Sequence, residues 1–292
     1  MTTDHRAYDI PLRTGRIVIV GDLHYDHFEV SPLEPFRSHR LDRLDWKGVD
    51  ALIVAGDIAD NPLANWRRAL DYLARYMPPV RTYVFPGNHD FYSFDLGGDA
   101  TLRQIVEAAG AVYVQQAELR YGTTRFLCCT LWTDFNLVGD PGGAMDVSEL
   151  YMMDYRRIRC TPMTGKPRWI RAEDIVAMHR NDRAWLEDHL SAPHFAGDES
   201  TTVVVTHHGP HPATAGSHDD LTASFHSDLS DLIEHHRPDY WFFGHSHRRL
   251  SAMVGNTEIR NVSIGYPSER RFRGDRPLLD LCVLDLPFGG GK

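Results

Sequence analysis

The stretch "GDLHYDHFE", residues 21–29, concentrates metal-binding side chains in a short span. Its two aspartates and two histidines follow directly after the apolar run "RIVIV"; they are Asp22, His24, Asp26 and His27. Carboxylate and imidazole groups without thiolate form a hard-to-borderline ligand set, which suits Mn, Fe, Zn or Mg better than copper(I) or an iron–sulfur cluster. The stretch therefore predicts part of a metal site, with Asp26 and His27 interpreted as loop residues near its mouth.

Polar clusters also follow four other apolar runs. After "ALIVA" comes Gly56-Asp57, after "TYVFP" comes Gly87-Asn88-His89-Asp90, after "TVVVT" come His207 and His208, and after "DYWFF" comes Gly244-His245-Ser246-His247. Ligands of open α/β sheets gather beyond the carboxyl ends of the strands, so these clusters can converge in one crevice. Residues two apart in an extended backbone point to the same side, which allows Asp22 with His24, and His245 with His247, to act in pairs.

Seven of these side chains form a candidate ligand set: Asp22, His24, Asp57, Asn88, His207, His245 and His247. They are too many for one tetrahedral ion and match what two ions require. Two ions about 3.5–4 Å apart can share a bridging carboxylate and a bridging water, and they activate that water at neutral pH. The prediction is therefore a centre of two divalent metal ions.

The elements that must position these clusters alternate along the chain. The apolar runs are nearly continuous, as in strands that are covered on both faces. Between them, apolar residues spaced three and four apart predict helices over residues 64–77, 100–110, 172–190 and 226–236. This alternation predicts an α/β fold. Residues 134–168, rich in Gly, Pro, Met and Arg, interrupt it and are interpreted as an excursion, either a flap over the site or a long surface connection.

Composition limits the classes of partner. Among 292 residues, 31 are basic and 40 acidic, and the net charge of −9 offers no broad attraction for nucleic acid or an anionic membrane. The four cysteines show no CxxC spacing, which counts against a zinc knuckle or a redox motif, and the adjacent Cys128 and Cys129 in an apolar run are interpreted as buried free thiols in a reducing compartment. The N-terminal residues do not form a signal peptide, and no run is long enough for a membrane helix, so we expect a cytoplasmic protein.

In chain order, the motifs DxH, GDxxD, GNHD, a strand-end histidine and GHxH resemble those of the calcineurin-like metallophosphoesterase superfamily. They run from residue 21 to residue 247 and so cover most of the chain. The HxHxDH signature of the metallo-β-lactamase fold matches "DLHYDH" less well, because Asp22 stands where its first histidine would be. The resemblance implies a four-layer α/β/β/α sandwich, in which helices flank two mixed β-sheets, as a single domain over residues 1–292.

The resemblance also implies a role for each site residue. Asp22, His24 and His247 would hold one metal ion, and Asn88, His207 and His245 the other, with Asp57 bridging both. His89 would contact the scissile phosphate and protonate the leaving alkoxide, and Asp90 would orient His89 through a ring nitrogen. Of the two adjacent histidines, His207 is the expected ligand, while His208 has a supporting or substrate-side role.

The implied activity is hydrolysis of a phosphomonoester or phosphodiester, in which a metal-bridging hydroxide attacks phosphorus in line. A small-molecule or nucleotide substrate is favoured, since the acidic balance counts against DNA and Asn61-Pro62 stands where the family's protein phosphatases carry an arginine. Arg156 is a candidate substrate contact, with a solvated basic face as its alternative. Two other functions stay open: a metallohydrolase of carbon–nitrogen or carbon–oxygen bonds, and a binding protein that keeps the fold without catalysis.

Overall fold

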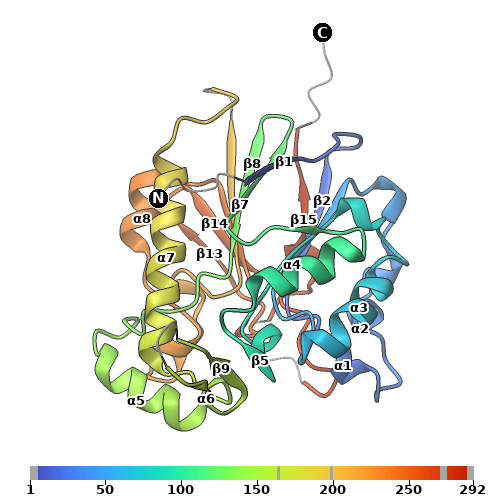
Figure 1. The fold of residues 1–292 in the computed structure, drawn as a ribbon. Helices are drawn as coiled ribbons and strands as arrows, with labels where there is room; N and C mark the ends of the chain where they lie inside the picture. The colour runs from blue at the N-terminus through green and yellow to red at the C-terminus, as the bar shows by residue number, and fades with distance from the viewer. Residues whose placement is uncertain (1–5, 163–164, 198–199, 270–274, 288–292) are drawn as a thin grey trace.

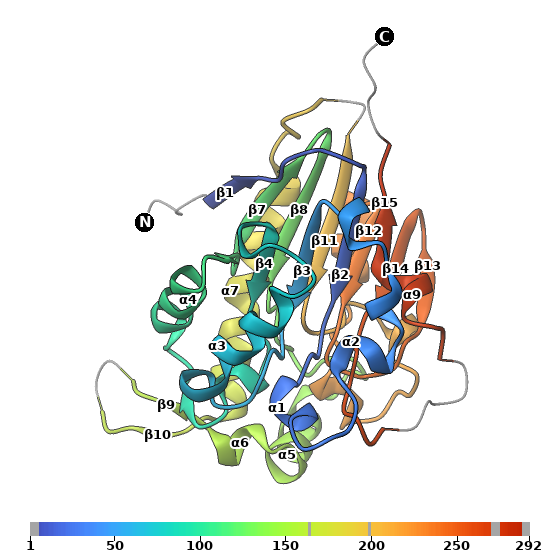
Figure 2. The ribbon, with the colours of Figure 1, turned by 90° about the vertical axis from the view of Figure 1, so that its right-hand side faces the viewer.

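Two β-sheets lie face to face at the centre of the protein, with helices on both outer sides (Figure 1, Figure 2). This computed structural model describes residues 6–162, 165–197, 200–269 and 275–287. The predicted four-layer α/β/β/α sandwich of two mixed sheets is confirmed.

The larger sheet joins strands from most of the described chain. In spatial order they are β1 (Arg6–Asp9), β7 (Ala117–Tyr121), β8 (Thr124–Cys129), β11 (Thr201–Thr206), β12 (Tyr240–Phe243), β14 (Thr257–Asn261) and β13 (Ser251–Val254). Alternate residues of β8 face opposite ways. Phe126 and Cys128 pack in the main core, whereas Leu127 and Cys129 pack with residues of α7 (Ala172–Ser191) and α8 (Ser230–His236). Both faces of the strand are therefore buried, as its continuous apolar run requires.

The smaller sheet supplies three of the predicted strand-end clusters. Its order is β15 (Val283–Asp285), β2 (Arg16–Val20), β3 (Ala51–Ala55), β4 (Thr82–Phe85) and β6 (Val112–Tyr113), and only the β15–β2 pair of these described strands is antiparallel. The helices α3 (Pro62–Leu73) and α4 (Asp99–Ala108) cover its outer face (Figure 2). The α3 helix ends at Leu73, four residues before the predicted end at residue 77. The Pro78-Pro79 pair prevents a helix from continuing past residue 77.

Residues 134–168, predicted as an excursion, contain α5 (Pro141–Tyr151), α6 (Asp154–Arg157), β9 (Ile158–Cys160) and the start of β10 (Arg168–Trp169). Strand β9 pairs with β10 and with β5 (Phe94–Asp95) in a small third sheet. Residues 163–164 lie outside the described residues. The α5 helix begins after Asp140, whose side chain accepts a hydrogen bond from the Gly143 N–H, and Pro141 occupies its first turn. Figure 1 shows α5 and α6 beyond the lower end of the two large sheets.

Short helical segments occupy several connections: α1 (Tyr25–Phe28), α2 (Pro35–Ser38), α9 (Leu279–Cys282) and the 3₁₀ turns Leu41–Arg43, Trp46–Gly48, Pro79–Arg81, His89–Phe91, Pro212–Thr214 and Thr222–Ser224. Cys128 and Cys129 are buried free thiols, and Cys160 and Cys282 are free as well. Within the described ranges, no helix combines the length and the apolar character that crossing a bilayer would demand.

Asp50 ties the start of β2 to the start of β3. Its buried carboxylate accepts hydrogen bonds from the backbone N–H groups of residues 13–15 and from the Tyr121 hydroxyl. The Asp50→Ala substitution leaves these donors without their acceptor, so we expect the free energy of unfolding to fall by about 3 kcal/mol in urea denaturation. As the control, Asp71→Ala removes an exposed carboxylate paired with Arg67 and should cost less than about 0.5 kcal/mol. A loss below about 1 kcal/mol for Asp50→Ala would contradict this anchoring role.

Candidate metal centre

Five strand ends meet at the same edge of the two sheets. Strands β2, β3 and β4 of the smaller sheet and β11 and β12 of the larger sheet each lead into a polar cluster. Backbone hydrogen bonds join the clusters, since the Asp22 N–H donates to Gly56 O and the Gly244 N–H to His207 O, both at 3.0 Å. Two glycines allow this approach: a Cβ on Gly56 would stand 2.7 Å from the Gly87 nitrogen, and one on Gly244 would stand 2.5 Å from Asp22 Oδ2.

The clusters form two groups of candidate ligands. One holds Asp22, His24 and His247, and the other holds Asp57, His207 and His245, with the ligand atoms of each group within 4.8 Å of one another. In the first group, His247 Nε2 lies 3.3 Å from Asp22 Oδ1 and 3.1 Å from His24 Nε2. In the second, His207 Nε2 lies 3.4 Å from Asp57 Oδ1 and 3.1 Å from Asn88 Oδ1. The structure thus brings all seven predicted ligands together.

Asp57 stands between the two groups. Its Oδ2 lies 3.6 Å from His24 Nε2 of the first group, and its Oδ1 lies 3.4 Å from His207 Nε2 of the second. Burial raises the pKa of this carboxyl, but the neighbouring His207 and His89 outweigh burial and hold the pKa of Asp57 well below its usual range. Asp57 is therefore an ionised group at the position from which a carboxylate can contact two cations.

The donor set fits divalent cations. His245 Nε2 is buried and has no hydrogen-bond partner among the described residues. A buried polar atom left in this way costs about 1–3 kcal/mol, and a metal ion near the ring offsets such a cost. Left-handed backbone at non-glycine residues is rare and clusters at functional sites. Five of the seven predicted ligands adopt it: Asp22, His24, Asp57, His245 and His247.

Asn88 is oriented by a residue of the 134–168 excursion. Asp154 Oδ1 accepts a hydrogen bond from Asn88 Nδ2 at 2.9 Å and another from the Tyr92 hydroxyl at 2.6 Å. With its NH₂ group committed to Asp154, the Asn88 amide turns its oxygen toward His207 Nε2. Sequence reasoning did not find Asp154, because nothing local to "MMDYRR" indicates that it reaches a strand end more than sixty residues earlier.

Two of the histidines are fixed through their second ring nitrogen. His247 Nδ1 lies 2.8 Å from Glu269 Oε1 and 2.9 Å from Oε2, and His207 Nδ1 lies 2.8 Å from the Ala55 carbonyl oxygen. Such partners fix the tautomer, so that Nε2 is left as the metal-binding nitrogen. Glu269 lies beyond the last recognised motif, and sequence reasoning missed it.

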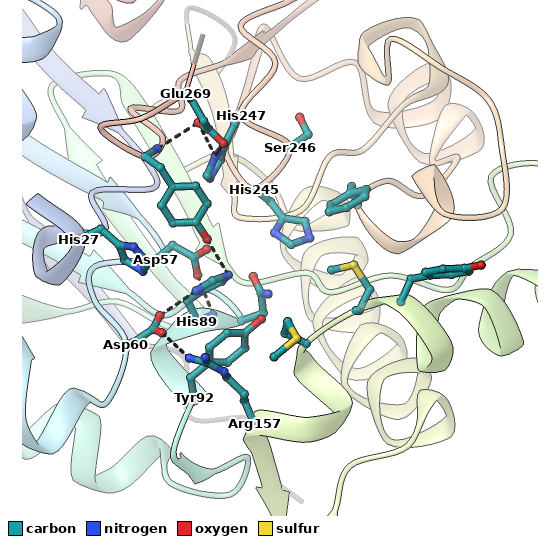
Figure 3. Close-up of a pocket in the computed structure, with 16 residues that line it drawn as sticks. His27, Asp57, Asp60, His89, Tyr92, Arg157, His245, Ser246, His247 and Glu269 are labelled. Atoms are coloured by element: carbon teal, nitrogen blue, oxygen red, sulfur yellow. Dashed lines mark hydrogen bonds and ion pairs between the residues drawn. The ribbon is translucent and has the colours of Figure 1, made fainter.

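His89 is held by Asp60, and the prediction that Asp90 orients it is wrong. His89 Nδ1 lies 2.8 Å from Asp60 Oδ1 (Figure 3). The buried Asp90 instead accepts hydrogen bonds from the backbone N–H groups of Gly87, Ile58 and Ala59 and from Trp66 Nε1, and it thereby holds two strand-end loops together. Burial, reinforced by the Asp57 carboxylate, raises the pKa of Asp90 to about 7. Asp60 is the second aspartate of the GDxxD motif, which could have identified it.

The other ring nitrogen of His89 faces Tyr266. The Tyr266 hydroxyl lies 3.2 Å from His89 Nε2, and the tyrosine ring stacks on His24 with a centroid separation of 4.3 Å. Burial lowers the pKa of His89, but the carboxylates of Asp57 and Asp60 outweigh burial, so the pKa is raised. His89 is thus an imidazole with one nitrogen anchored and with its protonated form favoured by two neighbouring carboxylates.

The profile of the calcineurin-like phosphoesterase family matches residues 15–249. The chain belongs to this family. It is therefore a metal-dependent hydrolase of phosphoester bonds. The recognition made from the strand-end motifs is confirmed.

The likeness to one solved structure supports the fold of this calcineurin-like phosphoesterase. The phosphopantetheinyl hydrolase of Mycobacterium tuberculosis is 18% identical, with a TM-score of 0.63 over 91% of this chain and 95% of that chain. The protein TT1561 of Thermus thermophilus is 13% identical, with a TM-score of 0.45 over 86% of this chain and 90% of that chain. No curated protein matches the sequence.

A cavity of about 470 Å³ opens over the metal centre of this calcineurin-like phosphoesterase (Figure 3). Four of the candidate ligands line it, and they are Asp57, Asn88, His245 and His247. His89 and Asp60 face the same space, and His27 lines it as expected for a residue near the mouth. His208 is buried, with its ring 4.1 Å from that of His245, which agrees with a supporting role and not with a substrate-side role.

The arginine that lines the cavity is Arg157. Its Nη1 lies 3.2 Å from Asp60 Oδ2, and its guanidinium lies over the Tyr92 ring, 5.5 Å from the centroid. Arg156 donates instead to the backbone carbonyl oxygens of Leu150 and Met152, at 2.8 and 3.2 Å. Arg156 does not line this cavity, because the carbonyl groups at the end of α5 bind its guanidinium, and its contact with substrate stays a prediction.

Proposed function

We propose that this calcineurin-like phosphoesterase hydrolyses the phosphoester bond of a small molecule or nucleotide with two divalent metal ions. The position of Asp57 between the two ligand groups is the observation that carries the proposal. In the proposed assignment, one ion is held by Asp22, His24 and His247, the other by Asn88, His207 and His245, and both by Asp57. When bound, the ions supply charge neutralisation at the phosphoryl group and a water that is deprotonated near neutral pH.

The chain's own groups then assist departure of the leaving alcohol. His89 Nε2 faces the cavity, where it can give a proton to the oxygen of the breaking bond. Asp60 keeps the imidazole in position by accepting from Nδ1, and it favours the protonated form. The closed packing of Tyr92 and Tyr266 against His89 limits its rotation, since the Tyr92 ring lies 4.1 Å from the imidazole.

Metal reconstitution combined with a substrate panel tests the proposal. Protein stripped by a chelator is loaded separately with Mn, Fe, Zn or Mg, and bound metal is quantified by mass spectrometry. The panel contains p-nitrophenyl phosphate, bis(p-nitrophenyl) phosphate and p-nitrophenyl acetate. A phosphopantetheinyl ester, the chemistry for which the Mycobacterium tuberculosis neighbour is named, completes it. We expect two ions per chain and metal-dependent cleavage of a phosphoester. Saturation at a single ion, or faster cleavage of the carboxylic ester, would refute the proposal.

Asp60→Ala tests the positioning of His89. We expect kcat to fall roughly 10–100-fold with little change in KM, because the imidazole loses the carboxylate that orients it. The double variant separates positioning of His89 from general damage to the fold. If Asp60 acts through His89, adding Asp60→Ala to His89→Ala should lower kcat little further. Asp95→Ala, which removes a partly buried carboxylate on β5 that does not line the cavity, is the control and should retain wild-type kcat. Fully additive losses would contradict action through His89.

A further inference from the structure

Four apolar side chains line the cavity beside the metal centre: Tyr151, Met152, Met153 and Phe225. We call them the apolar wall. Tyr151 is 65% exposed and Met153 is 45% exposed, although neither position lies on a face that needs to be apolar for folding. Metal ions and hydrogen-bond donors are enough to bind a phosphate group, so phosphate binding does not explain these apolar side chains. Apolar side chains that are exposed or partly exposed in a cavity next to a reactive centre indicate a binding surface for an apolar group.

The wall is fixed relative to the metal centre. Tyr151 is the last residue of α5, and the Arg156 guanidinium donates to the carbonyl oxygens of the residues on either side of it, Leu150 and Met152. The next segment is anchored to the centre because Asp154 accepts from Asn88 Nδ2. Phe225 comes from a different part of the chain, and its ring lies 4.9 Å from that of His245. The wall is therefore a preformed surface at one side of the proposed second ion.

Apart from the proposed ions, the described charged side chains that line the cavity are paired with one another and offer no further cation to a substrate with extra negative charge. Asp60 and Glu269 contribute two carboxylates to its lining. Arg157 contributes a guanidinium, but this group is already paired with Asp60 at 3.2 Å. A phosphodiester carries one negative charge less than the dianion of a phosphomonoester, and a polyphosphate carries more. An additional anionic group on the substrate would lie near carboxylates without a free cation among the described lining residues.

Phe225 of the wall and His89 lie in different parts of the cavity. His89 is flanked by Tyr92 and Tyr266, neither of which belongs to the wall, whereas Phe225 lies against His245. Since His89 protonates the leaving oxygen in the proposed mechanism, the ester group that stays on phosphorus is the one that faces the wall.

We propose that the substrate is a phosphodiester whose retained ester group is uncharged and apolar and packs on the apolar wall. This inference rests on the proposed function. In the reaction, water forms the new P–O bond and the bond from phosphorus to the leaving oxygen breaks. The leaving oxygen keeps the electron pair of the broken bond and takes a proton from His89. The attacking water loses one proton, which replaces the one that His89 gave. The products are an alcohol and the monoester of the apolar group.

The test compares three substrates that share the p-nitrophenolate leaving group and differ in what stays on phosphorus. They are phenyl p-nitrophenyl phosphate, methyl p-nitrophenyl phosphate and p-nitrophenyl phosphate. We expect kcat/KM for the phenyl diester to exceed that for the methyl diester roughly tenfold, mainly through KM, because the phenyl group buries apolar surface on the wall. The monoester should be the poorest of the three.

A double variant, Met152→Ser with Met153→Ser, should bring the phenyl-to-methyl ratio of kcat/KM close to one. The ratio is internal to each enzyme preparation, so partial misfolding does not alter it. Met253→Ser is the matched control, because Met253 is 62% exposed on β13 and does not line this cavity; its ratio should equal that of the wild type. A ratio near one in the wild type, a ratio that persists in the double variant, or a preferred monoester would overturn the inference alone. Failure of the metal-loaded wild type to cleave any phosphoester would refute the proposed function, and this inference with it.

Discussion

Asp57→Asn is expected to lower kcat/KM for a phosphodiester at least about 10³-fold, the largest loss that we predict for a single substitution. The carboxylate contacts both ligand groups, with its two oxygens 3.6 and 3.4 Å from His24 Nε2 and His207 Nε2. An amide has one neutral oxygen and an NH₂ group that repels a cation, so it cannot serve both groups. Hydrolysis and metal content should be measured on the same preparation, and bound metal should fall below two ions per chain.

The control for Asp57→Asn is Asp71→Asn, an equivalent change at an exposed carboxylate on α3, which should retain both metal and activity. Thermal unfolding of the metal-free proteins separates metal loss from structural loss. Without metal, Asp57→Asn takes the carboxylate partner from the buried His24 and His207, so the melting temperature should fall, and metal content is compared at a temperature where both metal-free proteins stay folded. Normal turnover with two bound ions in the variant would eliminate Asp57 as the shared ligand, and with it the proposed two-ion centre.

The ligand positions could be predicted from sequence because each depends on a local pattern. An apolar β-branched run predicts a strand, and the residue after its last buried position lies at the edge of the sheet. A glycine at that edge allows the backbone of a neighbouring loop to approach closely. For example, Gly56 and Asp57 follow Ala55, the last residue of β3, and the structure places them at the meeting edge of both sheets. The fold follows from the same runs, since strands that are apolar on both faces must lie between two layers.

The groups that orient the ligands could not be predicted in this way. Asp154 and Glu269 lie in connections whose path depends on tertiary packing, and their partners are distant in sequence. The error at Asp90 has a local cause. His89 and Asp90 are adjacent in a 3₁₀ turn, where neighbouring side chains diverge, so Asp90 turns into the core and Asp60 reaches His89 from another loop.

The excursion at residues 134–168 shows how far composition can indicate function. Its Gly, Pro, Met and Arg content marked a departure from the α/β alternation, but it did not distinguish a flap from a surface connection. In the structure, residues 151–153 and Arg157 line the cavity, and Asp154 contacts Asn88. The segment is therefore part of the site. It supplies the apolar side chains of residues 151–153, whereas the strand-end motifs supply metal-binding groups.

His89→Ala is expected to have an effect that depends on the leaving group. For a diester with an alkyl leaving group, kcat/KM should fall roughly 10²–10⁴-fold, because the departing alkoxide is a strong base and requires the proton that His89 gives. For a p-nitrophenyl diester the loss should stay below about tenfold, since p-nitrophenolate departs without protonation. Steady-state kinetics on a series of diesters with leaving groups of increasing basicity would measure the difference as a steeper dependence on basicity in the variant.

Two observations would make this result specific to proton donation. The variant should keep two bound ions per chain, which separates it from Asp57→Asn, and His235→Ala at the exposed end of α8 should behave as the wild type on every ester. An equal loss for the alkyl and p-nitrophenyl esters would mean that His89 stabilises the phosphoryl group instead of protonating the leaving oxygen. In that case the Tyr266 hydroxyl, 3.2 Å from His89 Nε2, would be the nearest described group able to donate the proton, and Tyr266→Phe would then show the leaving-group dependence.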